Sequence, residues 1–208
     1  MTKIKLCGMS RLCDIEAVNS LMPDFIGFVF YEKSKRSVSF QKAYELSMHL
    51  NSGITPVGVF VDEAIQNIEM LVKNGTISAV QLHGHENDEY IRTLRTRIDC
   101  PIIQAFKIKS ESDISAANTS MADFILLDSG LGSGNLFEHS LISGIKREFF
   151  LAGGINAENV GDAILRYKPY AADASSSLET DNLKDKNKMA AFVNAVRNAD
   201  KIKLKGNN

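Results

Sequence analysis

Short runs of apolar and β-branched residues recur along the chain, separated by longer segments in which apolar positions lie three and four residues apart. The eight runs begin at residues 3, 25, 56, 79, 101, 124, 149 and 170, so that successive starts are 21 to 31 residues apart. That spacing holds one strand, one helix and two short loops, and repeated strand–helix units build a parallel sheet. The pattern therefore predicts an α/β fold.

Three of the intervening segments have a clear helical pattern. Residues 63–75 carry apolar side chains on one helical face and end in Gly75, a residue type that commonly terminates helices. Residues 156–167 begin with Asn156, a preferred N-cap, and residues 184–199 repeat apolar positions at the same spacing. The segments after the fifth and sixth runs have the weakest patterns, and we expect the polar C-terminal sequence KIKLKGNN to fray.

Eight strand–helix units predict a single-domain (β/α)8 TIM barrel over residues 1–208, although this length is short for the fold. A doubly wound open sheet is the alternative. That architecture usually has fewer strands and often carries a glycine-rich turn after its first strand, where this chain has only CGMS. The number of repeats favours the barrel.

Composition and charge narrow the class of protein. Hydrophobic residues make up 44% of the 208 residues and charged residues 24%, which is typical of a soluble globular chain. The formal net charge of −1, with no block of like charges, argues against nucleic acid or a membrane surface as a partner. The apolar runs are too short to span a bilayer and no signal peptide is visible, so we expect a cytoplasmic protein.

The cysteines and histidines indicate neither a disulfide framework nor a metal site. Cys7, Cys13 and Cys100 are odd in number and irregularly spaced. The only close histidine pair, His83 and His85, lacks carboxylate or cysteine partners at metal-ligand spacing. We therefore expect free thiols and no structural zinc.

Polar residues gather where the predicted strands end, and in a (β/α)8 barrel the active site lies at those carboxyl ends. The residues concerned are Cys7, Arg36, His83, Asp128, Gly153, Gly154, Asp173, Ser175 and Ser176. Because side chains alternate along a strand, Lys3, Lys5 and Cys7 share the inward face, and Ile4 and Leu6 point toward the helices. Inward polar groups are costly unless paired, so their clustering predicts a functional site.

Each of these residues also has a structural interpretation. His83 can be a hydrogen-bonded core histidine, Asp128 a helix cap and Arg36 a solvated loop charge. The sequence LAGGINAEN can be only a tight turn into a helix. However, two glycines at the end of the seventh strand, followed by SSS after the eighth, match the phosphate site that many barrels build there.

Several motifs together resemble one enzyme family. The sequences KIKLCGMS, GFVFYEKSKR, VGVFVD, VQLHG, ILLDS…GSG, LAGGINAENV and DASSSLE…KD resemble, in order and spacing, the phosphoribosylanthranilate isomerases of tryptophan biosynthesis, from residue 3 to about residue 197. The resemblance implies a (β/α)8 barrel, a small phosphosugar substrate, no cofactor and a monomer or homodimer. The implied reaction is an Amadori rearrangement of N-(5-phosphoribosyl)anthranilate.

The resemblance also implies residue roles. Cys7 matches the family's general base, Asp128 its general acid and Arg36 the position that holds the anthranilate group. His83 and Asp173 fall at substrate-binding positions; Gly153, Gly154, Ser175 and Ser176 fall in the phosphate-binding turns. To act as a base, Cys7 needs a lowered pKa and hence a positive neighbour, for which we expect Lys5. To act as an acid, Asp128 must hold its proton, and we expect partial desolvation to raise its pKa.

The sequence departs from the family pattern in two places. After the sixth strand it reads GSGNLFEHS, with Asn135 for a lysine, Glu138 for an aspartate and His139 for a tryptophan. After the eighth strand, Ser177 replaces the usual glycine. These changes bear on one loop and one phosphate contact, and they leave the expected acid and base in place.

Three other functions remain open at this level. A metal-dependent pentose-phosphate epimerase needs several converging histidines and carboxylates, whereas only His83 lies at a strand end. Indole-glycerol-phosphate synthase needs a lysine–glutamate pair, for which Lys3, Lys5 and Lys107 are the candidate lysines. A non-catalytic phosphate-ligand binder needs neither an acid nor a base, so the presence of both Cys7 and Asp128 argues against it.

Overall fold

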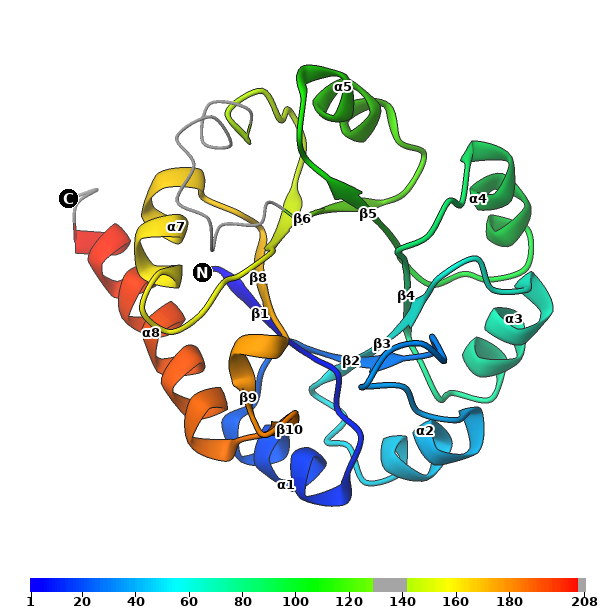
Figure 1. The fold of residues 1–208 in the computed structure, drawn as a ribbon, viewed down its shortest axis with the longest axis horizontal. Helices are drawn as coiled ribbons and strands as arrows, with labels where there is room; N and C mark the ends of the chain where they lie inside the picture. The colour runs from blue at the N-terminus through cyan, green and yellow to red at the C-terminus, as the bar shows by residue number, and fades with distance from the viewer. Residues whose placement is uncertain (129–141, 206–208) are drawn as a thin grey trace.

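Eight parallel strands close into a barrel with helices around its outside (Figure 1), in a computed structural model that describes residues 1–128 and 142–205. The strands are β1 (Lys3–Cys7), β2 (Phe25–Val29), β3 (Thr55–Phe60), β4 (Ala79–Leu82), β5 (Ile102–Lys107), β6 (Phe124–Asp128), β7 (Phe149–Ala152) and β8 (Ala171–Ala174). Each strand pairs with the next, and β8 pairs with β1. The predicted (β/α)8 barrel is confirmed, and the open sheet is wrong.

The helices cover the outside of the barrel. They are α1 (Leu12–Leu21), α2 (Phe40–Ser47), α3 (Ile65–Lys73), α4 (Asp88–Arg95), α5 (Glu111–Thr119), α7 (Val160–Tyr167) and α8 (Lys186–Lys205). Between β8 and α8 the chain forms a short 3-10 helix, η2 (Ser176–Leu178), and a small hairpin of β9 (Glu179–Thr180) and β10 (Leu183–Lys184). Within residues 1–128 and 142–205, no helix is both long and apolar enough to cross a membrane.

Two helix boundaries differ from the sequence prediction. The side chain of Asn156 accepts hydrogen bonds from the backbone N–H groups of Glu158 and Asn159, at 2.9 and 3.0 Å, and so holds a turn in front of α7. That helix consequently begins at Val160. At the other end of the chain, α8 continues through Lys205, beyond the predicted end at residue 199. Residues 206–208 of the tail that is expected to fray lie outside the described residues.

Apolar side chains pack between the strands and the surrounding helices, and they also fill the half of the barrel interior away from the carboxyl ends of the strands. Ile4 and Leu6 point outward as predicted and belong to the same buried cluster as Val18 of α1 and Phe192 of α8. Inside the barrel a second buried cluster contains Val57, Ala79, Ile103, Leu126, Phe150 and Ala171. Each large side chain in such a core contributes about 1.5–3 kcal/mol. This inner cluster leaves only the carboxyl-end half of the interior for polar groups.

Strand register sets which polar residues meet above the inner cluster. Lys5 of β1 lies opposite Asp173 of β8, and Cys7 lies opposite Gly27 of β2. The parallel register therefore brings a lysine, an aspartate and a thiol together from positions 168 residues apart.

Candidate active site

A cavity of about 620 Å³ opens at the carboxyl ends of the strands. Its lining includes every residue predicted for the site: Cys7, Arg36, His83, Asp128, Gly153, Gly154, Asp173, Ser175 and Ser176. Gln81 and Lys107 also line it. A second cavity of about 660 Å³, near Thr2 and Tyr170, lies at the opposite end of the barrel and contains none of them. The first cavity is the candidate active site, because these barrels place their chemistry at the carboxyl end.

A buried ion pair lies beneath the Cys7 thiol. Lys5 is fully buried, and its Nζ donates to Asp173 Oδ2 at 2.8 Å. Burial lowers the pKa of Lys5, but attraction to Asp173 and Cys7 outweighs it, so the net pKa is raised and the ammonium stays charged. For Asp173, burial raises the pKa and Lys5 lowers it, and the net pKa is raised.

The thiol itself feels opposing influences. Burial raises the pKa of Cys7 most, attraction to Lys5 lowers it, and repulsion from Asp173 raises it again. Lys5 therefore lowers the pKa of the thiol, as predicted from the sequence. Burial nevertheless outweighs it, and the net pKa of the thiol is raised, because the charged form loses its hydration in the barrel interior.

Two glycines that were not predicted from the sequence make room for functional side chains. A Cβ on Gly27 would lie 2.6 Å from the Cys7 Sγ. Gly8 has φ +89°, and a Cβ there would lie 2.6 Å from Arg36 Cδ. Both glycines belong to motifs quoted above, KIKLCGMS and GFVFYEKSKR, but the close approaches depend on neighbouring strands and loops.

Asp128 and His83 lie on another part of the cavity wall. Asp128 ends β6, and its Oδ2 is 4.0 Å from Nε2 of His83, which directly follows β4. The Nδ1 of that histidine lies 3.2 Å from Gln81 Nε2. Burial lowers the pKa of His83, although Asp128 opposes the shift, so a neutral imidazole is favoured. The Asp128 side chain is 31% exposed, so the expected desolvation is partial.

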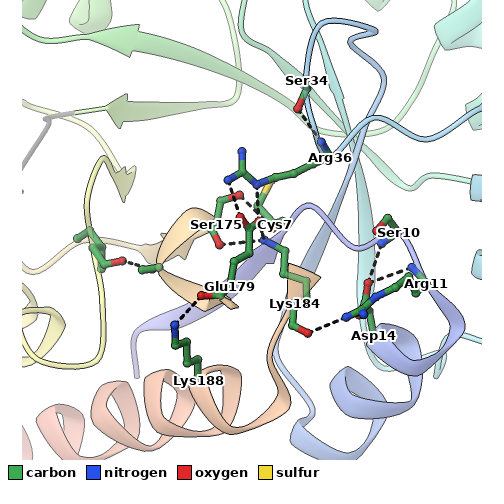
Figure 2. Close-up of polar contacts among 12 residues, drawn as sticks. Cys7, Ser10, Arg11, Asp14, Ser34, Arg36, Ser175, Glu179, Lys184 and Lys188 are labelled. Carbon is green, nitrogen blue, oxygen red and sulfur yellow. Dashed lines mark hydrogen bonds and ion pairs between the residues drawn. The ribbon is translucent and has the colours of Figure 1, made fainter. Parts of the chain in front are cut away.

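Arg36 is held by a carboxylate that the sequence reasoning did not single out. Its Nε and Nη2 donate to the two carboxylate oxygens of Glu179, at 2.5 and 2.8 Å (Figure 2). The hydrogen bond from Arg36 to Glu179 raises the pKa of the guanidinium. The interpretation of Arg36 as a solvated loop charge is therefore wrong. Glu179 and its neighbour Lys184 both lie in the motif DASSSLE…KD, which was the available signal.

The turns after β7 and β8 lie next to each other. Gly153 and Gly154 have positive φ values of 86° and 75°, which favour glycine. Ser175 Oγ donates to the carbonyl of Cys7 at 3.1 Å, and Ser177 Oγ donates to the carbonyl of Ile155 at 2.5 Å. Ser177 has no positive φ, so its position does not require glycine, and its hydroxyl bridges the two turns. The other departures, Asn135, Glu138 and His139, lie outside the described residues.

The acidic and sulfur-bearing side chains do not form a metal centre in the part of the chain that the structure describes. No group of three or more His, Cys, Asp or Glu residues there is arranged to hold an ion.

The fold and the cavity define the class of protein: a (β/α)8-barrel enzyme with its polar residues at the carboxyl ends of the strands. A family model described as N-(5'phosphoribosyl)anthranilate (PRA) isomerase matches residues 4–195. The chain therefore belongs to the N-(5'-phosphoribosyl)anthranilate isomerase family. This membership confirms the predicted isomerase class and the link to tryptophan biosynthesis.

Individual relatives agree with this assignment. The N-(5'-phosphoribosyl)anthranilate isomerase of Endomicrobium trichonymphae is 41% identical over 202 residues, covering 95% of this chain and 99% of the relative. The phosphoribosyl anthranilate isomerase structure from Thermotoga maritima is 35% identical, with a TM-score of 0.85, covering 95% of this chain and 100% of that one. A phosphoribosyl anthranilate isomerase structure in complex with reduced 1-(o-carboxyphenylamino)-1-deoxyribulose 5-phosphate is 33% identical, with a TM-score of 0.81 and the same coverage.

Proposed function

We propose that this chain converts N-(5-phosphoribosyl)anthranilate to 1-(2-carboxyphenylamino)-1-deoxyribulose 5-phosphate by an Amadori rearrangement, with Asp128 as general acid and Cys7 as general base. The observation that carries the proposal is that this carboxyl and this thiol line one cavity from two separated strands, β6 and β1. The same cavity also holds the paired turns after β7 and β8. A structural relative with a bound reduced form of the product supports the substrate class.

The first step needs an acid that reaches the ribose ring. Asp128 donates its proton to the ring oxygen, the C1–O bond breaks, and the nitrogen lone pair forms an iminium at C1. The partial exposure of Asp128 into the cavity gives a substrate access to its carboxyl group.

The second step needs a base on another side of the sugar. The iminium acidifies the C2 proton, the Cys7 thiolate removes it, and the electron pair left behind forms the C1–C2 double bond of an enolamine. Proton transfer from the C2 hydroxyl to C1 then gives the ketone, so substrate and product are isomers. Cys7 has gained one proton and Asp128 has lost one, and exchange of that proton through solvent returns both residues to their starting states. The charged Lys5 beside Cys7 stabilises the thiolate that this step requires.

Binding groups for each part of the substrate surround these two residues. The turns with Gly153, Gly154, Ser175 and Ser176 hold the phosphate, and Arg36 holds the anthranilate carboxylate through its guanidinium fork. Asp173 Oδ1 is buried and has no hydrogen-bond partner in the part of the chain that the structure describes. A buried acceptor of this kind is costly unless it is paired. Because Asp173 also lines the cavity and its other oxygen holds Lys5, we assign this residue to the substrate-binding wall.

Turnover of the substrate tests the proposal. Loss of the substrate's fluorescence is followed with the wild type, Cys7→Ser and Asp128→Asn, and Cys13→Ser serves as a matched control with an exposed thiol. We expect each active-site variant to lose about 10²- to 10⁴-fold in kcat, because each removes one acid–base group, and the control to keep wild-type activity. A wild type that binds phosphate analogues without turnover would instead identify a phosphate-ligand binder.

A further inference from the structure

We propose that Glu179 is a positioning residue for substrate binding: it holds one edge of the Arg36 guanidinium so that the other edge faces the anthranilate carboxylate. The inference rests on the proposed function and assigns a role to a residue outside the acid, the base and the phosphate turns. It concerns the hairpin of β9 and β10, which follows the eighth strand.

The geometry of the clamp is specific. Glu179 opens β9, its side chain is only 9% exposed, and it receives Arg36 Nε and Nη2 at 2.5 and 2.8 Å. The partners are 143 residues apart in the sequence. A second cation, Lys184 of β10, donates to Glu179 Oε1 at 2.6 Å and to the carbonyl of Ser175 at 2.8 Å. Glu179 is therefore held on both sides and cannot follow Arg36 into solvent.

The arginine has a second edge to offer. A guanidinium carries five N–H donors, and a carboxylate bound at Nε and Nη2 leaves both hydrogens of Nη1 and one of Nη2 for another acceptor. Among residues 1–128 and 142–205, no acceptor contacts Nη1 of Arg36. Figure 2 shows the third guanidinium nitrogen pointing away from Glu179. That edge has the geometry for a second, bidentate carboxylate, and the cavity is lined by this arginine.

The local charge also suits an anionic ligand. Arg36 and Lys184 together carry two positive charges and Glu179 one negative charge, so the group keeps a net positive charge beside the cavity. Without the clamp, the long Arg36 side chain would have to be ordered by the substrate itself, and that ordering would weaken binding. This ordering would weaken binding of the anthranilate end of the substrate and leave binding of the phosphate end unchanged.

The experiment combines steady-state kinetics with inhibition by the two ends of the substrate. Wild type, Glu179→Gln, Arg36→Met and the double variant are assayed with N-(5-phosphoribosyl)anthranilate, and free anthranilate and inorganic phosphate serve as inhibitors. Glu69→Gln is the matched control, because Glu69 pairs with Lys73 and Arg97 on the outside of the barrel. Thermal melts check that each variant is folded. If Glu179→Gln does not fold, Glu179→Asp replaces it, because it keeps the charge and shortens the reach.

We expect Glu179→Gln to raise KM and the inhibition constant of anthranilate about tenfold, equivalent to about 1.4 kcal/mol. The inhibition constant of phosphate and kcat should stay within twofold, and Glu179→Gln should add nothing in the Arg36→Met background. Equal weakening of both inhibitors, an additive effect in the double variant, or a lower KM would each overturn the positioning role. A wild type without turnover would instead refute the proposed function, so the two failures are distinguishable.

Discussion

Replacing Lys5 by methionine removes the charge beneath the thiol and keeps a side chain of similar length. The Lys5 ammonium is fully buried and lies 2.8 Å from Asp173 Oδ2, so its loss leaves a buried carboxylate without its counter-ion. Breaking a buried pair in this way typically costs about 3–5 kcal/mol. In a chain of this size about 1 kcal/mol corresponds to roughly 2–4 °C in Tm. We therefore expect Tm to fall by about 6 to 20 °C.

The same substitution should raise the pKa of the Cys7 thiol. Burial and the charge of Asp173 both raise this pKa, and Lys5 lowers it. Removing Lys5 therefore raises the pKa of the thiol further. The rise of kcat/KM with pH, which follows formation of the thiolate, should accordingly move to more alkaline values. Lys184 also lowers the thiol pKa, so some thiolate stabilisation persists in the variant.

Differential scanning calorimetry measures the first effect, and the ultraviolet absorbance of the thiolate as a function of pH measures the second. Subtracting the titration of a Cys7→Ser protein removes the signals of Cys13 and Cys100. Lys3→Met is the matched control: it lies on the same strand face, but its side chain is 46% exposed against Asp24, so about 1 kcal/mol or less is expected. The reasoning is refuted if Lys5→Met melts like Lys3→Met, or if the thiol pKa does not rise.

Two further predictions concern packing and pH. Gly27→Ala places a Cβ 2.6 Å from the Cys7 Sγ, so we expect the free energy of unfolding to fall by about 1–3 kcal/mol and kcat to fall as well. Gly161→Ala is the control: its Cβ would have nothing within 4 Å, so the substitution should be neutral or stabilising. Equal melting curves for the two variants would contradict this prediction. Burial raises the pKa of Asp24, but hydrogen bonds from Lys3 and the Ile4 N–H outweigh it, and the net pKa is lowered. The stability that Asp24 contributes is therefore fully present above the ordinary aspartate pKa of 3.8 and is lost as pH falls through the lower pKa of the folded state. When Tm is measured as a function of pH, we expect it to fall less steeply in acid for Asp24→Asn than for the wild type.

The periodic part of the fold was predictable from the sequence. The strands follow from the recurring apolar runs and the inward face of β1 from alternation along a strand, and the buried stripe of α3 follows from helical spacing. These properties depend on residues two to four positions apart. The strand-end rule then predicted every residue that was named for the site, and all of them line one cavity.

The barrel, the faces of its strands and the set of polar residues at one end could all be predicted from local patterns. How those residues act on one another depends on the folded chain, in which Lys5 meets Asp173, Glu179 clamps Arg36, and burial outweighs Lys5 at the thiol. Distance along the chain explains the difference. Closure of the barrel joins β8 to β1 and brings the β9–β10 hairpin to the loop after β2, and no local pattern records contacts between residues more than a hundred positions apart.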